Sequence, residues 1–452
     1  MNYFADYAWL PQGWDEDVRI DVDAGKLVCV QSGTTRAADA EHVGRYVLPG
    51  MPNLHSHAFQ RAMAGLAERQ TNPSDSFWTW RETMYAFASR VGPDELQAIA
   101  AQLYVEMLQA GYTHVCEFHY LHHQSEGQPY ADPAAMSLAL IAAAREAGIG
   151  LTLLPTLYMT GGFDGRPLSE RQRRFGFDAD AYLRLVQQLI KMENSIVRVG
   201  AALHSLRAVS ETALRTVLDA AEIKGRPLHI HIAEQIGEVQ DCLALRGARP
   251  VEWLLDHAAV DEHWCLVHAT HLTESETQRL ARSGAVAGLC PTTEANLGDG
   301  LFPLKSYRDS GGVLGVGSDS HISVSPVEEL RWLEYGQRLV TRHRNIAVSE
   351  SSASVGENLW GDALFGGARA AGTAIGVLED AARADWIVLD DNAPQLAARD
   401  AGDAVDSFIF SGNANLVRDV MVDGAWVVRD GRHRDEERIA KRYRETVVRL
   451  AR

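Results

Sequence analysis

Between residues 49 and 370 the chain repeats one pattern: a short apolar run, a polar junction and a stretch with helical periodicity. Continuous apolar runs are typical of parallel strands buried on both faces, and the helical stretches fit the crossovers between them. Eight runs predict a (β/α)₈ barrel, an α/β fold. They cover residues 48–55, 113–120, 150–158, 198–204, 227–234, 264–270, 285–291 and 313–320.

The two ends of the chain carry a different pattern. Short strand-like runs separated by turns fill residues 1–48, and further runs occur at 385–390, 407–412 and 417–431. The last run surrounds an Asp-Gly pair, which is a strong hairpin signal. Because strands from both ends of a chain can pair, we expect a small composite β-sandwich domain. It would comprise residues 1–48 and 371–452, beside a barrel of residues 49–370.

The last residues of the chain predict an amphipathic helix. Apolar side chains recur there at helical spacing, which places them on one stripe that packs against another element. The stripe consists of Ile439, Tyr443, Val447 and Leu450.

Most of the predicted barrel strands end in side chains that ionise or form hydrogen bonds. Because the carboxyl ends of barrel strands open onto one face, we expect these side chains to meet in a single cavity. They are His55 and His57, Glu117 to Tyr120, His204, His231 and Glu234, His268, and Asp319.

Three imidazoles and a carboxylate among these side chains suit a catalytic zinc ion with one position left for water. His55 and His57 are two residues apart in an extended segment, so both point the same way. A histidine of the fifth strand and Asp319 of the eighth complete the set. In the fifth strand His229 and His231 face the same side, so the alternation alone leaves either as the ligand.

Four segments resemble the metal and catalytic motifs of the amidohydrolase superfamily, in the same order: LPGMPNLHSH, HIHIAE, LVHATHL and GVGSDS. The resemblance covers nearly the whole chain, because ADWIVLD and the valine-rich hairpin are similar to the β domain of those enzymes. The HxxE spacing of the superfamily selects His231 over His229, and the strand end favours His268 over His271. The resemblance implies that the metal ligands are His55, His57, His231 and Asp319. It also implies that the catalytic groups are Glu234, His268 and Asp319.

Lysine is rare, with five residues among the 43 lysines and arginines. Binuclear members of the superfamily bridge their metals with a carboxylated lysine at the end of the fourth strand, and no lysine lies at a predicted strand end here. Glu117 could replace that lysine, or could hold a neighbouring side chain. We expect one metal ion per subunit, as in the mononuclear deaminases, where zinc is usual and iron is occasional.

The groups of such a site define its chemistry. A bound zinc ion lowers the pKa of water from ~15.7 towards ~7. Asp319 can accept that proton, Glu234 can protonate an imino nitrogen, and His268 can polarise the leaving group. Hydrolytic attack on a carbon that carries nitrogen then releases ammonia.

Two arginines, a tyrosine, a glutamine and a further histidine lie near the predicted strand ends or in the first loop: Arg81, Arg207, Tyr120, Gln60 and His204. They indicate a small substrate with carboxylates, because arginine binds carboxylates bidentately. The segments LHSHAFQRAMAG, FWTWRETMY, EFHYLHH, GAALHSLRAV and HIHIAEQ resemble the formimidoylglutamate deiminase family within that superfamily. This resemblance implies hydrolysis of N-formimidoyl-L-glutamate to N-formyl-L-glutamate and ammonia in histidine degradation. It also implies that the glutamate part is held by Gln60, Arg81, Tyr120, His204 and Arg207.

The amino-acid composition limits the classes of molecule that the protein is expected to bind. The formal net charge of −17 disfavours nucleic acids and anionic membranes. A small dicarboxylate remains compatible, because it needs only two or three cations in one cavity. Five cysteines without a CxxC spacing, and an acidic start to the chain, predict a cytoplasmic protein.

The family and the tail helix favour a homodimer. The alternative functions are another mononuclear deaminase that acts on guanine or an adenosine derivative, a binuclear dihydropyrimidinase-like hydrolase, and a non-catalytic barrel paralogue.

Overall fold

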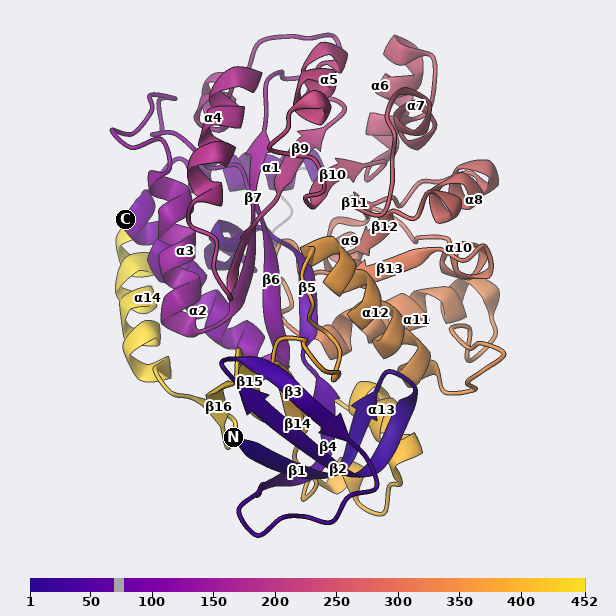
Figure 1. Ribbon diagram of the computed structural model, residues 1–452. Helices are drawn as coiled ribbons and strands as arrows, with labels where there is room; N and C mark the ends of the chain where they lie inside the picture. The colour runs from indigo at the N-terminus through magenta and orange to yellow at the C-terminus, as the bar shows by residue number, and fades with distance from the viewer. Residues whose placement is uncertain (69–76, 452) are drawn as a thin grey trace.

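Eight parallel strands form the predicted barrel, in which each strand pairs with the next along the chain (Figure 1). The computed structural model describes residues 1–68 and 77–451, and only the backbone of residues 77–79. The barrel strands are β5 (Met51–Ser56), β6 (Tyr112–His119), β7 (Gly150–Leu157), β9 (Ala201–Ser205), β10 (Leu228–Ile232), β11 (Trp264–His268), β12 (Val286–Leu289) and β13 (Val313–Val316).

The barrel closes where the end of β5 meets the segment after β13. Ser56 and Asp319 form an isolated parallel bridge. The amide of Asp319 donates to the carbonyl of His55 at 3.0 Å, and the amide of His57 donates to the carbonyl of Asp319 at 3.2 Å. The closure therefore brings the first and last motifs of the sequence into direct contact.

The fourth predicted strand is broken at Gly200 into β8 (Val197–Val199) and β9. The amide of Gly200 donates to Leu153, whereas the next amide donates to Pro227 on the other side. A Cβ atom at Gly200 would lie 2.7 Å from both the Leu154 side chain and the Pro227 carbonyl oxygen. Only glycine fits this crossing point, and the apolar run gave no sign of the break.

Helices surround the strands, and α4 (Ala179–Ile190) shows how an apolar stripe packs on them (Figure 1). In α4 the stripe is Tyr182, Leu185, Val186 and Leu189, and Asp178 caps the helix by accepting from the amide of Ala181. No helix in the described part of the chain combines the length and apolar character needed to cross a bilayer. The other helices are η1 (Ala58–Met63), α1 (Phe77–Ala88), α2 (Pro93–Ala110), α3 (Ala135–Ala147), η2 (Glu170–Phe175), α5 (Glu211–Asp219), α6 (Ile236–Arg246), α7 (Pro250–His257), α8 (Glu274–Ser283), α9 (Pro291–Leu297), α10 (Leu304–Asp309), α11 (Pro326–Thr341) and α12 (Val355–Ala371).

The two ends of the chain join in one sheet domain at the lower end of the molecule in Figure 1. The N- and C-terminal parts meet where β4 pairs antiparallel with β14. The hydrogen bonds run through a single mixed sheet in the order β17-β16-β15-β14-β4-β1-β2-β3 rather than through two separate sheets. The strands are β1 (Asn2–Leu10), β2 (Gly13–Asp23), β3 (Lys26–Gln31), β4 (Glu41–Pro49), β14 (Trp386–Leu389), β15 (Val417–Val422), β16 (Ala425–Arg429) and β17 (Arg432–His433).

Residues 407–412, which the sequence suggested as a strand, belong instead to the end of helix α13 (Ala401–Phe410) and the turn after it. The buried positions of this helix are Ala404, Val405, Phe408 and Ile409. This spacing of three and four residues is helical, and the apolar run SFIF does not alternate as a half-buried strand does. A short η3 helix (Pro394–Leu396) precedes it.

The C-terminal helix α14 (Glu436–Leu450) packs along α2 of the barrel (Figure 1). Ile439 and Leu450 are buried, and Tyr443 and Val447 pack against the same core. The range 371–452, which we assigned to the β domain, therefore contains two helices, α13 and α14, that lie against barrel helices.

Candidate active site

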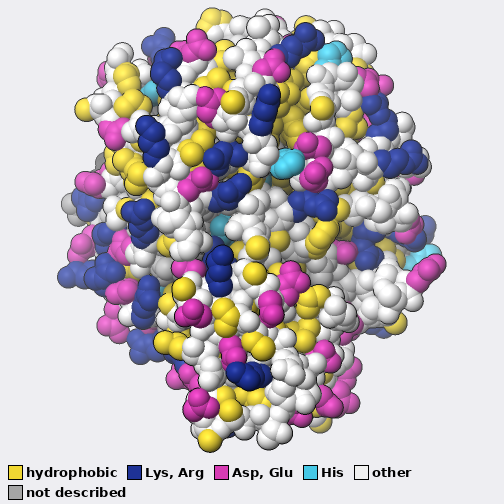
Figure 2. Space-filling model, in the orientation of Figure 1, with side chains coloured by type: hydrophobic (Ala, Val, Ile, Leu, Met, Phe, Trp, Pro, Cys, Tyr) yellow, Lys and Arg dark blue, Asp and Glu magenta, His cyan; other side chains and the backbone are white. Residues whose placement is uncertain are grey.

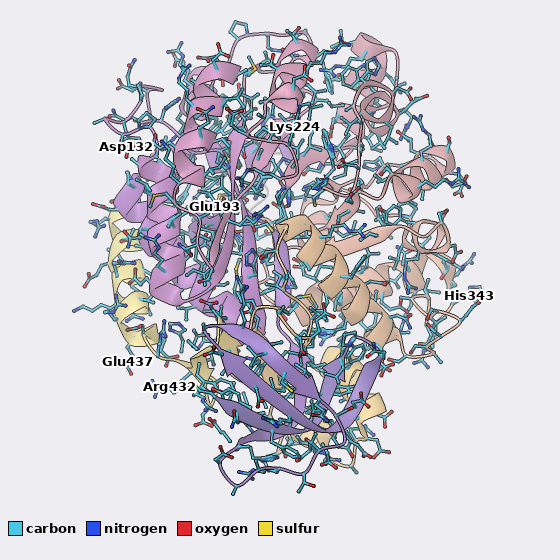
Figure 3. The ribbon with its side chains drawn as sticks, in the orientation of Figure 1. Asp132, Glu193, Lys224, His343, Arg432 and Glu437 are labelled. Carbon is cyan, nitrogen blue, oxygen red and sulfur yellow. The ribbon has the colours of Figure 1, made fainter. Side chains whose placement is uncertain are left out.

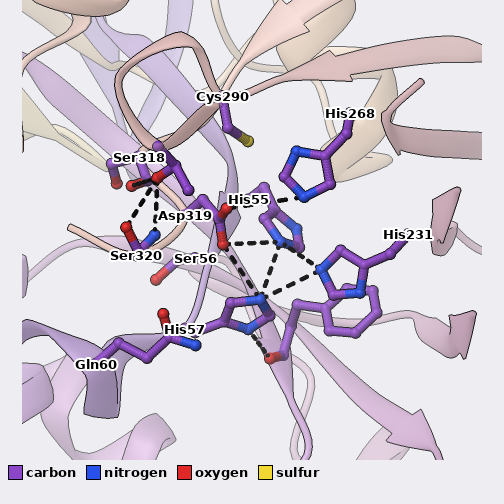
Figure 4. Close-up of polar contacts among 12 residues, drawn as sticks. His55, Ser56, His57, Gln60, His231, His268, Cys290, Ser318, Asp319 and Ser320 are labelled. Carbon is purple, nitrogen blue, oxygen red and sulfur yellow. Dashed lines mark hydrogen bonds and ion pairs between the residues drawn. The ribbon is translucent and has the colours of Figure 1, made fainter. Parts of the chain in front are cut away.

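Three imidazoles meet at the carboxyl ends of β5 and β10 (Figure 4). The Nε2 atom of His55 lies 3.1 Å from that of His57 and 3.0 Å from that of His231. The Nε2 atoms of His57 and His231 are 3.3 Å apart. Four ligands of a tetrahedral zinc ion with bonds of ~2.0–2.1 Å are separated by about 3.3 Å. The spacing of the three nitrogens fits such an ion.

Hydrogen bonds determine which ring nitrogen of two of these histidines faces inward. His57 Nδ1 lies 2.8 Å from the carbonyl oxygen of Phe118, and His231 Nδ1 lies 3.0 Å from that of His204. A carbonyl oxygen only accepts, so both Nδ1 atoms carry the proton and both Nε2 atoms present lone pairs to each other. Burial lowers the pKa of both histidines, which keeps them neutral. Facing lone pairs repel unless a cation lies between them, and this chemistry also fits a metal site.

Asp319 adds a carboxylate to the cluster. Its Oδ1 atom lies 3.3 Å from His57 Nε2 and 3.5 Å from His55 Nε2. The residue has a φ of +45°, and His268, the last residue of β11, has a φ of +68°. Residues other than glycine rarely adopt this left-handed conformation, which is frequent at functional sites.

His268 lies among carboxylates. Its Nε2 atom is 3.8 Å from Asp319 and 3.9 Å from Glu234, and its Nδ1 atom is 3.3 Å from Glu294 of α9. Burial opposes protonation of His268, but Glu234 and the other carboxylates raise its pKa to about 10. Burial, together with the charge of Asp319, raises the pKa of Glu234. Glu234 and His268 therefore influence each other: the negative charge of Glu234 raises the pKa of His268, and the positive charge of His268 lowers the pKa of Glu234.

Glu117 supports the β5 end of the site. One of its oxygens accepts from the Ser56 hydroxyl at 2.6 Å and from Tyr104 at 3.2 Å, and the other accepts from the amide of Ala58 at 2.7 Å. These contacts hold the chain on both sides of His57. Burial raises the pKa of Glu117 to about 7.

The five lysines all lie away from the barrel strands: Lys26 in β3, Lys191 after α4, Lys224 after α5, Lys305 in α10 and Lys441 in α14. Figure 3 shows Lys224 beside α5, among the outer helices. In this fold no lysine is placed at a barrel strand end to bridge two metal ions.

A cavity of about 660 Å³, its open mouth included, lies above the histidine cluster. His55 lies beneath the cavity, at its fully buried base. The other predicted residues all line it: His57, Gln60, Arg81, Tyr120, His204, Arg207, His231, Glu234, His268 and Asp319.

Two arginines approach the cavity from different elements. The Arg81 guanidinium of α1 lies 5.4 Å from the ring centre of Tyr85. Arg207 follows β9, and its charge acts on the same tyrosine and on His204. On another wall the Gln60 amide donates to the Tyr120 hydroxyl at 3.0 Å. The cavity thus holds cationic and neutral donors together with the histidine cluster.

Comparison with known proteins identifies the family. A model of the amidohydrolase family matches residues 46–427. The chain belongs to the amidohydrolase family. It is 54% identical over 441 residues to the formimidoylglutamate deiminase of Pseudomonas aeruginosa, and the match covers 97% of each chain.

More distant similarity extends to other deaminases. The chain is 26% identical over 421 residues to the 5-methylthioadenosine/S-adenosylhomocysteine deaminase of Halobacterium salinarum, covering 92% of this chain and 89% of that one.

Among solved structures, the crystal structure of an amidohydrolase from Brucella melitensis is 44% identical, and the match covers 100% of each chain with a TM-score of 0.94.

The structure shows which histidine of each candidate pair lies in the cavity: His229 or His231, and His268 or His271. His229 lies one layer below the cluster, and its Nε2 atom donates to the carbonyl oxygen of Ala370 at 2.9 Å. His271 lies beyond the strand end and is partly exposed, with its carbonyl bound by Arg249. His231 and His268 are the members of each pair that line the cavity.

Several residues of the cavity were missed. Tyr158 follows β7, and the third strand could have been included with the other strand ends. Glu238 lies in the first turn of α6, and it accepts from the amides of Ala233 and Glu234 before the helix at 3.1 Å each. The others come from loops or helices whose place over the barrel has no local signal: Trp80, Met84, Tyr85, Phe175 and Leu297. The residues Phe77, Trp78 and Thr79 of the segment FWTWRETMY lie outside the described side chains.

Proposed function

We propose that this amidohydrolase converts N-formimidoyl-L-glutamate and water to N-formyl-L-glutamate and ammonia. The observation that carries this proposal is the composition of one cavity. It joins a set of metal ligands, a carboxyl group with a raised pKa, and two arginines. The extensive similarity to a deiminase of that name supports the same reaction.

We infer that the resident metal is one zinc ion per chain, with iron as the alternative, held by His55, His57, His231 and Asp319. Neutral imidazoles with inward lone pairs and one carboxylate are a suitable donor set for zinc. When bound, zinc would supply a water of lowered pKa at the base of the cavity. The absence of a lysine at the strand ends supports one ion rather than two.

We assign the two proton transfers to Asp319 and Glu234, and the stabilisation of charge to His268. Asp319 reaches both the histidine cluster and His268, so it is placed to accept a proton from water. Glu234, whose pKa is raised by burial, lies 3.9 Å from His268 and is assigned to protonate the departing nitrogen. His268, held by Glu294, supports the charge that develops on the substrate. Protonated nitrogen then leaves as ammonia.

We assign the binding of the glutamate part to Gln60, Arg81, Tyr120, His204 and Arg207. Guanidinium groups bind carboxylates with charge-assisted hydrogen bonds, which are stronger than neutral ones. Two arginines near the same tyrosine of the cavity favour a substrate with carboxylates.

The biological setting is also a proposal. A chain with this reaction would act in histidine degradation in the cytoplasm, and five free cysteines, four of them buried, are compatible with a reducing compartment. Figure 2 shows basic and acidic side chains interspersed over one face, which does not favour a polyanionic partner such as nucleic acid or an anionic membrane. A homodimer is supported by exposed apolar side chains at helical spacing on α11: Trp332, Tyr335 and Leu339.

The test compares substrates and measures the metal. We expect ammonia release from N-formimidoyl-L-glutamate and none of comparable rate from guanine, adenosine or 5-methylthioadenosine, with about one zinc ion per chain. Ammonia from one of the purine substrates but not from the amidine would favour the alternative deaminase. A protein inactive on all of them would favour a non-catalytic paralogue.

A further inference from the structure

Gln172 is a polar residue that the sequence did not single out, and it is buried beside the cavity. It belongs to η2, the short helix between β7 and α4. Its Oε1 atom accepts from the amide of Ser169 at 3.0 Å. Because a backbone amide only donates, this contact determines the orientation of the side-chain amide. The Nε2 atom therefore faces the other way and acts as a donor.

Two tyrosine hydroxyls receive these donors. Gln172 Nε2 lies 2.9 Å from the hydroxyl oxygen of Tyr158 and 3.3 Å from that of Tyr85. Each tyrosine oxygen therefore accepts, and its own O–H proton is directed elsewhere. Both tyrosines line the cavity. Among the described residues, neither hydroxyl donates to a protein acceptor.

The charged neighbours of these hydroxyls include two guanidinium groups. Arg81 and Arg207 both act electrostatically on Tyr85, and Arg207 also acts on Tyr158. Arginine has donors and no acceptor, so the two hydroxyls and two guanidinium groups form a set of donors around one part of the cavity. Such a set matches the oxygens of an anion.

The short helix η2 also contacts α1, which carries Arg81 and Tyr85, two of these four donors. The buried guanidinium of Arg174 donates to the carbonyl oxygens of Ala88, Val91 and His123. Ala88 is the last residue of α1, the helix that carries Arg81 and Tyr85. η2 therefore both places α1 and orients its tyrosine.

We propose that Gln172 is a positioning residue for carboxylate recognition, because it turns the hydroxyl protons of Tyr85 and Tyr158 toward the anion that Arg81 and Arg207 bind. This inference rests on the proposed function, in which the substrate carries carboxylates. It adds two neutral donors to the two guanidinium groups, and it assigns their orientation to a residue that does not touch the substrate.

The first experiment measures steady-state kinetics of the Gln172→Met variant, which keeps the side-chain volume and removes the amide. We expect KM for N-formimidoyl-L-glutamate to rise about 10- to 100-fold, since hydrogen bonds to a charged group are weakened, while kcat changes by less than about 3-fold. With formamidine, an amidine without carboxylates, kcat/KM should stay as in the wild type. The matched control is Gln278→Met on α8, where the glutamine amide contacts Glu274.

The Gln172→Glu variant tests the direction of the hydrogen bonds. A carboxylate at this position would accept from the tyrosine hydroxyls and turn their protons away from the cavity. KM should therefore rise further than in Gln172→Met. An effect of Gln172→Met on formamidine as large as that on the dicarboxylate would overturn the inference, and so would an unchanged KM.

A double-variant background separates positioning from a structural role. In a Tyr85→Phe/Tyr158→Phe protein the hydroxyls are gone, so adding Gln172→Met should change KM by less than about 2-fold. An undiminished effect would show that Gln172 acts through the fold alone.

Binding of N-formyl-L-glutamate, followed by titration calorimetry, separates this inference from the proposed reaction. Weaker binding by Gln172→Met supports the inference even if the wild-type protein fails to release ammonia from the amidine. Equal binding by the two proteins contradicts it even if the reaction is as proposed.

Discussion

The Nε2 atoms of His55 and His231 lie 3.0 Å apart although 176 residues separate them along the chain. Parallel strands β5 and β10 bring them to one face of the barrel. His229 is two residues before His231 on the same strand, yet its ring contacts the carbonyl of Ala370 in the layer below. The depth of a histidine along its strand thus decides which ring reaches the cluster.

This difference predicts the outcome of metal analysis on two variants. His231→Asn should lower the bound metal from about one ion per chain to a small fraction, because one of four ligands is lost. His229→Asn, the matched control, should keep its metal. Inductively coupled plasma mass spectrometry on the folded variants measures the metal content. Loss of metal in His229→Asn but not in His231→Asn would show that His229 is the ligand.

Glu117 should control metal affinity without touching the metal. Its carboxylate accepts from Ser56 and Ala58 on both sides of His57. A Glu117→Gln change replaces one acceptor oxygen with a donor, which disturbs that loop. Residues that orient metal ligands typically contribute 10- to 100-fold to metal affinity. Competition with a chelating dye should show a loss of about this size, and wild-type affinity would show that the loop is held by other contacts.

The same residue predicts a pH dependence of stability. Burial raises the pKa of the Glu117 carboxyl from 4.5 to about 7, so the folded protein binds a proton that the unfolded chain releases at lower pH. This contribution to the free energy of unfolding is complete below pH 4.5 and is lost as the pH rises through 7. Relative to Glu117→Gln, the wild-type free energy of unfolding should fall by about 3 kcal/mol from pH 4.5 to 7.5. Urea denaturation at both pH values measures it, and a constant difference would contradict the raised pKa.

Glu234 should affect turnover more than binding. It faces His268 at 3.9 Å and burial raises its pKa, so we assign it the protonation of the departing nitrogen. Glu234→Gln keeps the shape and removes the acid. We expect kcat to fall by about 10²- to 10⁴-fold with the metal retained. Pre-steady-state and steady-state ammonia release measure the effect, and a variant with wild-type kcat would remove Glu234 from the mechanism.

Arg207 should affect binding more than turnover. Arg207→Met is expected to raise KM for the dicarboxylate by about 10- to 100-fold while the metal content stays unchanged. Arg207→Lys should recover part of the loss, because it restores the charge but not the bidentate geometry. Arg215→Met is the surface control, since Arg215 pairs with Glu211 on exposed α5. An unchanged KM in Arg207→Met would argue against a carboxylate in this part of the cavity.

The strand ends were predictable because their signal is local. An apolar run that ends in His55 and His57, in His231 or in Asp319 has the same form whatever surrounds it, and a barrel brings all such ends to one face. The break at Gly200 was not predictable, since it depends on contacts with Leu154 and Pro227 across two strand neighbours. The helix at 401–410 was misread because a four-residue apolar run has no clear period.

Most polar residues that orient the side chains of the site could not be predicted from the sequence, for a different reason. Gln172, Tyr85 and Glu294 each act on a partner from another segment, and the contact exists only after the helices have packed. Glu117 stood at a strand end and was noticed, but its sequence position could not distinguish a metal bridge from a residue that holds the His57 loop. The structure places it in contact with Ser56, Ala58 and Tyr104.

The most direct test of the account is the identity of the products formed from N-formimidoyl-L-glutamate in oxygen-18 water. The proposed reaction predicts ammonia and N-formyl-L-glutamate in equal amounts, with one labelled oxygen in the formyl group as seen by mass spectrometry. Formation of formamide and glutamate would show that the wrong nitrogen was assigned as the leaving group. No product from this amidine, together with ammonia from a purine substrate, would contradict the proposed function itself.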